Sequence, residues 1–252
     1  MKRFSAFFFF VGIHSIFAAT WQWKLVDSIA HPQTRFTQGL FWDGPELVES
    51  TGLVGRSAVY RMNKSGKVLD SAIIPAPHFG EGSARFGDDL LVLTWQSKKG
   101  FILDAKTLDA KGEFPIPGEG WGLATGDNCL WLSNGSPKIL KLSPDTKEVV
   151  GGLDVTSAGK PVGNLNEIEV FGKYMLANIW FSDSVAVIGM ADGKVVAWLD
   201  FSTLAKRTRK GSAGAEVLNG LAWDGKRLWL TGKLWSKIFA VEIKEPVKDS
   251  KP

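Results

Sequence analysis

The chain has 252 residues, of which 44% are hydrophobic and 22% charged, a balance that supports a packed core and excludes an intrinsically disordered protein. Its formal net charge is +4, and removal of Lys2 and Arg3 with the predicted leader lowers it to +2, so neither nucleic acid nor an anionic membrane surface is expected as a partner. Cys129 is the only cysteine, which excludes an internal disulfide.

The first 19 residues have the pattern of a secretory signal peptide. Lys2 and Arg3 precede an apolar run that ends at Ala19. Cleavage after Ala19 would place Phe17 where a small residue is preferred, and the alternative is an uncleaved membrane anchor, for which the run is short and interrupted by His14. We therefore predict a periplasmic or secreted protein, and export without disulfides favours a bacterial periplasm.

The following residues repeat one pattern five times: a glycine or an acid, a short apolar strand, a polar turn and a second apolar strand. Turns such as WDG, GDD and GDN are typical of hairpins, because Asp, Asn and Gly tolerate a positive φ. A further strand-like segment follows each unit. The units begin at Gly39, Gly82, Gly122, Glu167 and Gly220.

Repeats of this length with three or four strands each predict an all-β fold, a five-bladed β-propeller that forms one domain over residues 20–244. A β-sandwich or an irregular β-solenoid is the alternative. A ring must close to hide the edges of its sheets. We expect the additional strand Trp21–Ile29 to close it by pairing with the last blade at KIFAVEI, residues 237–243. Residues 245–252 are predicted to be a poorly ordered tail.

In a propeller, the loops that enter the innermost strands meet at one mouth of the central channel. The starts of the five units should therefore bring together polar and aromatic side chains that lie far apart in the sequence. These are Gln38, Glu81, Glu119, Trp121, Asn166 and Asn219.

Two of these side chains are glutamates between glycines, Glu81 in FGEG and Glu119 in GEGWG. Partial burial would raise the pKa of either carboxyl group towards a value useful in general acid–base catalysis. The alternative for each is a structural role in a turn. The local sequence does not distinguish the two glutamates.

Four tryptophans lie at predicted strand ends and could form an apolar pocket at the mouth, with core packing as the alternative for each. They are Trp95, Trp121, Trp180 and Trp235. Lys233, in TGKLW, could stabilise a developing oxyanion or neutralise a nearby glutamate, or it could be an exposed charge at a strand end. The histidines do not form a metal-binding set, and no P-loop, G-x-S-x-G or H-E-x-x-H motif occurs.

Eight segments, taken together and in this order, resemble the plant-type glutaminyl-peptide cyclotransferases of plants and bacteria, over about residues 31–243. The segments are FTQGLFW, ESTGLVGRS, FGEG, LTWQ, GEGWGLATGDNCLWLSNGS, NLNEIE, ANIWFSD and NGLAWDGKRLWLTGKLW. The resemblance implies a five-bladed propeller and the conversion of N-terminal glutamine to pyroglutamate with release of ammonia, without a catalytic zinc.

The resemblance also implies roles for individual residues. Glu81 matches the general acid/base, Lys233 matches a polar group near the substrate, and Glu119 has no assigned role. We predict Glu81 and Lys233 as the catalytic residues. The substrate-binding positions are matched by Phe36, Gln38, Trp95, Trp121, Asn166 and Trp180, and no residue is implied as a metal ligand. The chain departs from the common family pattern beside the pocket, which bears on substrate preference, at Gln96, Phe181 and Ser236.

We expect a monomer that acts on peptides or proteins with N-terminal glutamine and has no membrane contact once the leader is removed. Because the mouth is open, later residues of the peptide should matter little. No cofactor is expected to be required, although a structural calcium could occupy the channel. One alternative is a non-catalytic periplasmic propeller that binds a peptide or sugar. Another is a calcium-dependent lactonase-type propeller, whose available ligands would be Glu81, Glu119, Asn166, Glu167 and Asn219.

Overall fold

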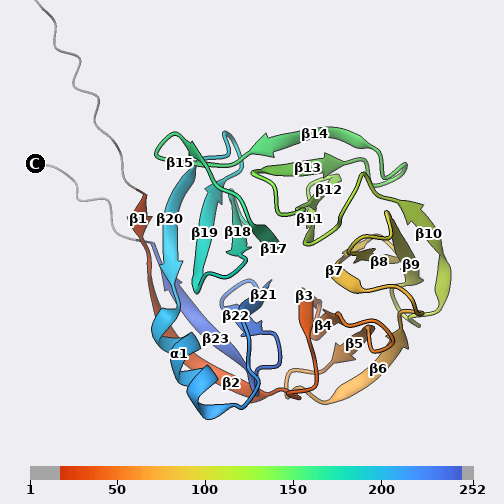
Figure 1. Ribbon diagram of the computed structural model, residues 1–252, viewed down its shortest axis with the longest axis horizontal. Helices are drawn as coiled ribbons and strands as arrows, with labels where there is room; N and C mark the ends of the chain where they lie inside the picture. Colours follow the sequence, from red (N-terminus) through yellow and green to blue (C-terminus); the bar gives the residue numbers. More distant parts are fainter. Residues whose placement is uncertain (1–17, 246–252) are drawn as a thin grey trace, which may run out of the picture.

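The computed structural model describes residues 18–245, so most of the predicted leader and nearly all of the predicted tail lie outside the described residues. Figure 1 shows five sheets of antiparallel main strands arranged around a central axis, with β3, β7, β11, β17 and β21 nearest the axis. The predicted five-bladed propeller is confirmed. Within residues 18–245, no helix is both long and apolar enough to cross a bilayer.

Each blade has four main strands, and the chain fills the first four blades from the inside outwards. The first blade contains β3 (Thr37–Asp43), β4 (Glu46–Thr51), β5 (Ala58–Met62) and β6 (Val68–Ile73). The second contains β7 (Gly80–Phe86), β8 (Asp89–Thr94), β9 (Lys99–Asp104) and β10 (Ala110–Pro115). The third contains β11 (Leu123–Gly126), β12 (Cys129–Leu132), β13 (Lys138–Leu142) and β14 (Val149–Asp154).

The fourth blade contains β17 (Leu165–Phe171), β18 (Tyr174–Ile179), β19 (Ser184–Gly189) and β20 (Val195–Asp200). The fifth contains β21 (Leu218–Trp223), β22 (Leu228–Gly232), β23 (Lys237–Lys244) and, as its outermost strand, β2 (Gln22–Ala30). Two shorter elements accompany the blades. Strands β15 (Thr156–Ser157) and β16 (Lys160–Pro161) form a hairpin between the third and fourth blades in the chain, and β1 (Ala19–Thr20) pairs parallel with β20 at the edge of the fourth blade.

The ring closes as the sequence predicts. Strand β2 pairs antiparallel with β23, from Gln22 opposite Lys244 to Ala30 opposite Lys237. The N-terminal strand thereby covers the edge that the last blade would otherwise expose. The connection from β2 to β3 then carries the chain from the last blade into the first.

A buried ion cluster anchors this connection. The Glu49 carboxylate on β4 accepts hydrogen bonds from His31 Nε2 (2.9 Å), Arg35 Nη1 (2.9 Å) and Thr37 Oγ1 (2.7 Å). His31 Nδ1 lies 2.7 Å from the Trp235 carbonyl oxygen, which can only accept. Because both ring nitrogens face acceptors, both must donate, and His31 is therefore an imidazolium ion.

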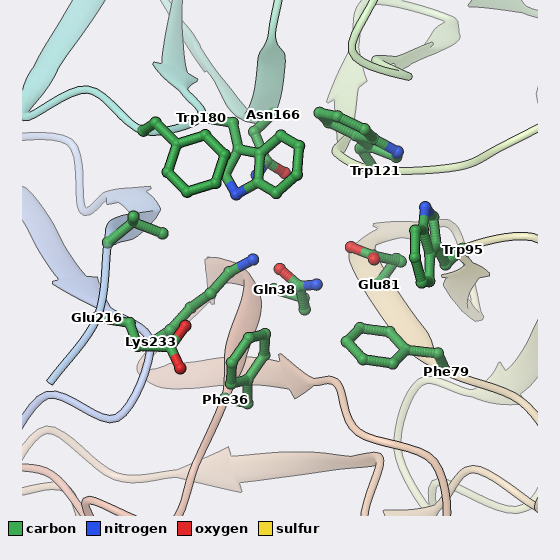
Figure 2. Close-up of a pocket in the computed structure, with 12 residues that line it drawn as sticks. Phe36, Gln38, Phe79, Glu81, Trp95, Trp121, Asn166, Trp180, Glu216 and Lys233 are labelled. Atoms are coloured by element: carbon green, nitrogen blue, oxygen red, sulfur yellow. The ribbon is translucent and has the colours of Figure 1, made fainter. Parts of the chain in front are cut away.

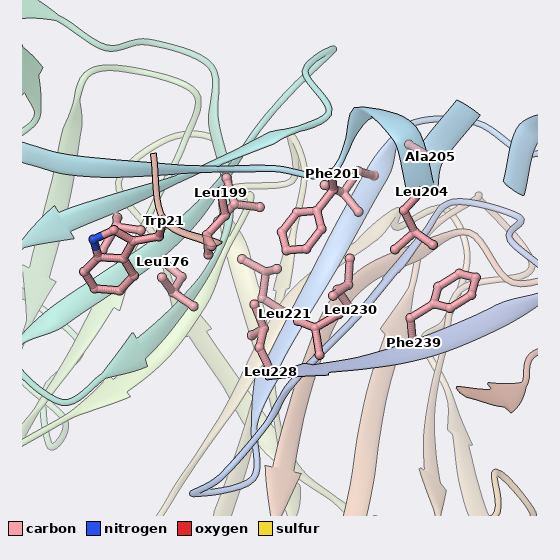
Figure 3. Close-up of a cluster of buried hydrophobic side chains, with 14 of the residues drawn as sticks. Trp21, Leu176, Leu199, Phe201, Leu204, Ala205, Leu221, Leu228, Leu230 and Phe239 are labelled. Carbon is pink, nitrogen blue, oxygen red and sulfur yellow. The ribbon is translucent and has the colours of Figure 1, made fainter. Parts of the chain in front are cut away.

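The hydrophobic core is divided among the interfaces between blades. Each of the five buried clusters in the described part of the chain joins the facing strands of two neighbouring sheets. Figure 3 shows the one between the fourth and fifth blades, where Leu176 and Leu199 meet Leu221 and Leu230. Alternating apolar residues in the strands supply these interfaces, because successive side chains point to opposite faces of a sheet.

One helix, α1 (Ser202–Gly211), was not expected from the sequence. It follows β20 and covers the cluster of Figure 3 with Leu204 and Ala205. Its outer end is held by Arg209, whose guanidinium donates to both carboxylate oxygens of Asp183 at 2.9 and 2.6 Å. The segment is short and has few apolar residues, so packing rather than sequence periodicity stabilises it.

Candidate active site

The inner strands of four blades have an irregularity at the same place, where they meet one mouth of the channel. Strand pairing shifts between Thr37 and Gly39, Gly80 and Ser83, Leu165 and Ile168, and Leu218 and Leu221. Bulges of this kind redirect side chains and are frequent beside active sites. The side chains within the irregular segments include Gln38, Glu81, Asn166 and Asn219.

Glycines beside these segments allow the inner strands of neighbouring blades to approach backbone to backbone. A Cβ atom on Gly82 would lie 2.6 Å from the Trp121 carbonyl oxygen, and one on Gly122 would lie 2.3 Å from that of Asn166. The Gly82 amide donates to the Trp121 carbonyl across the blade boundary at 2.7 Å. The last glycine of FGEG, Gly82, and the last glycine of GEGWG, Gly122, are therefore required for close packing.

The fourth blade has Glu167 where the strand registers place glycine in the other four. Its side chain is buried, and Oε1 lies 3.4 Å from the Leu40 amide of the first blade. Burial raises the pKa of Glu167 well above its usual range, with the charge of Glu169 adding to the shift. Glu167 thus links blades as a buried acid and does not line the pocket formed by its neighbour Asn166.

A cavity of about 290 Å³ opens at this mouth, and all eight predicted catalytic and substrate-binding residues line it (Figure 2). Four further lining residues were not expected: Phe79, Phe181, Glu216 and Val217. Phe79 is part of FGEG and Phe181 follows Trp180, so both lie within segments that the sequence singles out. Glu216 and Val217 lie after α1, where no motif marks them; backbone hydrogen bonds with Lys233 hold them at the pocket.

Glu81 combines deep burial with an unpaired carboxyl group. Its side chain is 4% exposed and, within residues 18–245, accepts no hydrogen bond. Burial raises the pKa of Glu81 well above its usual range; the positive charge of Lys233 opposes this shift and the negative charge of Glu119 adds to it. A carboxyl group with a raised pKa holds its proton to higher pH than an exposed glutamate does, which suits a group that both accepts and donates a proton.

Lys233 faces Glu81 across the pocket. Figure 2 shows the two side chains pointing inwards from opposite sides of Gln38. The Lys233 Nζ atom lies 4.7 Å from the centre of the Phe36 ring, and burial lowers the pKa of this amine although Glu81 and Glu216 oppose the shift. Lys233 therefore brings a partly desolvated positive charge to the pocket, where electrostatic interactions are stronger than in water.

Two amides complete the floor of the pocket. Gln38 Oε1 accepts a hydrogen bond from Asn219 Nδ2 at 3.2 Å, which leaves the Gln38 Nε2 group available to donate into the cavity. Asn166 is almost fully buried, and its Oδ1 atom has no partner among the described residues. Asn219 lies beside Gln38 as predicted, but it is completely buried and does not line the cavity itself.

Glu119 is outside the pocket lining and holds two of its walls. Its carboxylate accepts hydrogen bonds from Trp95 Nε1 (2.9 Å), Trp121 Nε1 (3.0 Å) and Gln96 Nε2 (3.1 Å). Burial alone would raise the pKa of Glu119, but the three donors lower it overall. The two glutamates with the same local sequence thus differ: the pKa of Glu81 is raised and that of Glu119 is lowered.

Trp235 does not belong to the aromatic wall; of the two alternatives left open for it, core packing is the one observed. It is fully buried in the cluster between the fourth and fifth blades, where its Nε1 donates to the Glu216 carbonyl at 3.0 Å. A position at a strand end does not determine to which face of the sheet a side chain points, so the sequence left both alternatives open.

The described residues do not assemble a metal-binding cluster of three or more His, Cys, Asp or Glu side chains. The five groups considered for a calcium-dependent lactonase are also separated. Glu81 and Asn166 line the pocket, whereas the other three contribute to its support or to the contacts between blades: Glu119, Glu167 and Asn219.

Comparisons with known proteins agree with this fold. The model of a family described as Glutamine cyclotransferase matches residues 12–243. Glutaminyl-peptide cyclotransferase of Arabidopsis thaliana is 36% identical over 228 residues, which cover 88% of this chain and 71% of the relative. The crystal structure of Myxococcus xanthus glutaminyl cyclase matches with a TM-score of 0.82 and 29% identity, over 90% of this chain and 98% of that chain.

The WD40 domain of Neurospora crassa Pan2 matches with a TM-score of 0.50 and 10% identity, over 91% of this chain and 98% of that chain, which is a likeness of fold alone. The family match, in contrast, spans nearly all of the described residues and includes every side chain of the pocket. It confirms the resemblance predicted from the eight segments, and the chain belongs to the glutamine cyclotransferase family.

Proposed function

We propose that this protein is a glutaminyl-peptide cyclotransferase, an acyltransferase that converts the N-terminal glutamine of peptides and proteins to pyroglutamate and releases ammonia. The observation that carries the proposal is the buried, unpaired carboxyl group of Glu81, which faces Lys233 across an aromatic pocket in a member of this family. The cavity is small for a ligand site, and its size suits one residue of a peptide better than a large cofactor.

The reaction forms one bond and breaks one bond within the same residue. The α-amine nitrogen attacks the side-chain amide carbon, a five-membered ring forms, and the C–N bond to the amide nitrogen breaks. One proton must move from the attacking nitrogen to the leaving nitrogen. Because nucleophile and carbonyl belong to one molecule, the pocket has only to hold the folded rotamer and move that proton.

Glu81 would carry the proton. Its carboxylate accepts it from the attacking amine and returns it to the departing nitrogen as ammonia leaves. The raised pKa of Glu81 brings its basic and acidic forms closer in free energy at neutral pH than they are for an exposed glutamate. One side chain can therefore act in both half-steps.

The oxygen of the attacked amide gains negative charge in the tetrahedral intermediate. Lys233 Nζ and Gln38 Nε2 are the donors placed to stabilise this charge. The side-chain amide of Asn166, which lines the cavity, would supply a further polar contact to the substrate. Phe36, Trp95, Trp121 and Trp180 would shape the slot and exclude water, which could otherwise hydrolyse the amide.

We expect Glu119→Gln to raise KM more than it lowers kcat. The neutral amide retains the volume of the side chain but weakens its hydrogen bonds to the Trp95 and Trp121 indoles, which then orient the substrate less well. Steady-state kinetics with a glutamine-initiated dipeptide gives both constants. Glu119→Asp, which retains the charge, should recover part of the loss; equal constants for wild type and Glu119→Gln would contradict the positioning role.

The proposed activity is tested by measuring ammonia and pyroglutamate from a glutamine-initiated dipeptide, with and without a chelator. Release that survives chelation supports the cyclase and the further proposal that no metal or other cofactor is required. Saturable binding without release would favour a peptide- or sugar-binding propeller, and chelator-sensitive activity on lactones would favour a lactonase. We also propose that the enzyme is monomeric and exported; light scattering and cell fractionation test these two statements.

A further inference from the structure

Phe181 occupies an unfavourable position at the rim of the pocket. It is the third residue of a turn closed by a hydrogen bond from the Ser182 amide to the Ile179 carbonyl (2.8 Å), and its φ of 66° lies in the left-handed region. Turns of this class favour glycine or asparagine there, and a bulky residue is a genuine outlier. The side chain is also 74% exposed, so burial in the protein does not compensate for this conformation.

The ring extends the aromatic wall of the pocket outwards. Phe181 stacks on Trp180, with ring centres 4.3 Å apart and an angle of 25° between the planes. Trp180 in turn meets Trp121 edge to face at 5.3 Å. Figure 2 shows Trp180 and Glu216 on the side of Gln38 away from Trp95, and Phe181 and Val217 line the same cavity as Glu216. This side of the cavity is therefore an apolar surface beside the carboxylate of Glu216.

We propose that Phe181 and Trp180 form a subsite for the side chain of the second substrate residue and that this subsite favours large apolar side chains. The inference rests on the proposed function. When the N-terminal glutamine lies against Glu81, the next residue is only about 3.5 Å further along the peptide and must leave the pocket past its rim. An apolar side chain there would cover exposed ring surface, which removes apolar area from water.

The expectation that later residues matter little is thereby restricted to the third residue and beyond. Glu216, which is exposed at the same edge, adds a negative charge that disfavours an acidic second residue. The sequence already marks the position, because Phe181 is one of the departures from the common family pattern.

The test compares kcat/KM for pyroglutamate formation from Gln-Leu-amide and Gln-Ala-amide. We expect wild type to prefer Gln-Leu-amide by about three- to tenfold, as is typical for one additional contact with an aromatic surface. Phe181→Gln should bring the ratio close to one. Phe181→Gly is a second variant that suits the left-handed φ, so it removes the ring without disturbing the turn, and it should give the same result.

Ile73→Gln is the matched control, because Ile73 is 80% exposed at the end of outer strand β6; it should retain the wild-type ratio. A wild-type ratio near one, or a ratio that persists in both Phe181 variants, would overturn the subsite while the cyclase activity stands. Failure of both peptides to cyclise would overturn the proposed function and the subsite together.

Discussion

Glu81→Gln is expected to lower kcat for pyroglutamate formation by about 10²- to 10⁴-fold while the protein stays folded. The amide has nearly the volume of the carboxyl group, but it can neither take the proton from the attacking amine nor deliver one to the leaving nitrogen. Removal of a buried ionisable group that accepts no hydrogen bond should not destabilise the fold. Kinetics with a glutamine-initiated dipeptide, together with circular dichroism and Tm, measures both effects.

Glu169→Gln is the matched control for this variant. Burial raises the pKa of Glu169 to about 8, so it too is a glutamate with a strongly raised pKa on an inner strand. It lines a different cavity, with Phe41 and Arg85, and its Oε1 accepts the Trp223 amide hydrogen at 2.8 Å. We expect its turnover to match wild type. Near-normal kinetics in Glu81→Gln, or an equal loss in both variants, would remove the specific role of Glu81.

The pH profile supplies a second readout for Glu81. A general base is active only when deprotonated, so activity should fall as the pH drops through the raised pKa of Glu81. This acid limb should lie well above the range of an ordinary glutamate. The residual activity of Glu81→Gln should lack the limb and show only the titration of the substrate amine.

The fold could be predicted because the sequence pattern that specifies it is local and occurs once in every blade. Each hairpin has its own alternation and turn residues, and the five starts from Gly39 to Gly220 occupy matching registers in the five sheets. The same registers explain why the mouth could be predicted, since equivalent positions of inner strands must meet around one axis. Strand β2 was predictable as the closing strand because an unpaired edge in the last blade required a partner.

Properties that depend on contacts between blades could not be read in this way. Glu81 and Glu119 have nearly identical neighbours in sequence; the family resemblance favours Glu81, but the physical difference, three donors that converge on Glu119, is visible only in the structure. For Trp235 the sequence left core packing and a place in the pocket wall equally open, because a position at a strand end does not determine the direction of the side chain. Helix α1 depends on the surface left open between two blades, which no segment of the sequence encodes alone.

Glu49→Ala is expected to lower the free energy of unfolding by about 3–5 kcal/mol, because it leaves the His31 and Arg35 cations buried without their counter-charge. The lost contacts hold the connection between the closing strand and the first blade, so the ring itself should be weakened. Urea unfolding measures the change. Asp192→Ala is the control: its pair with Lys194 is exposed, and its removal should leave the unfolding curve unchanged.

The same cluster predicts how stability varies with pH. Burial would lower the pKa of His31, but the charge and hydrogen bond of Glu49 raise it overall. The contribution of His31 to folding stability is therefore complete below about pH 6.5 and is lost as the pH rises through the pKa of His31 in the folded protein. Burial would raise the pKa of Glu49, but His31, Arg35 and Thr37 lower it overall. The contribution of Glu49 to folding stability is therefore complete above about pH 4.5 and is lost as the pH falls through the pKa of Glu49 in the folded protein.

The contribution of the cluster to stability should therefore be largest between about pH 4.5 and 6.5 and decline on either side. In Glu49→Ala the alkaline decline should disappear, because His31 then has no carboxylate to favour its charged form and burial lowers its pKa instead. Urea unfolding of both proteins at a series of pH values measures this difference. An alkaline decline of equal size in the variant would show that the coupling of His31 to Glu49 does not stabilise the closure of the ring.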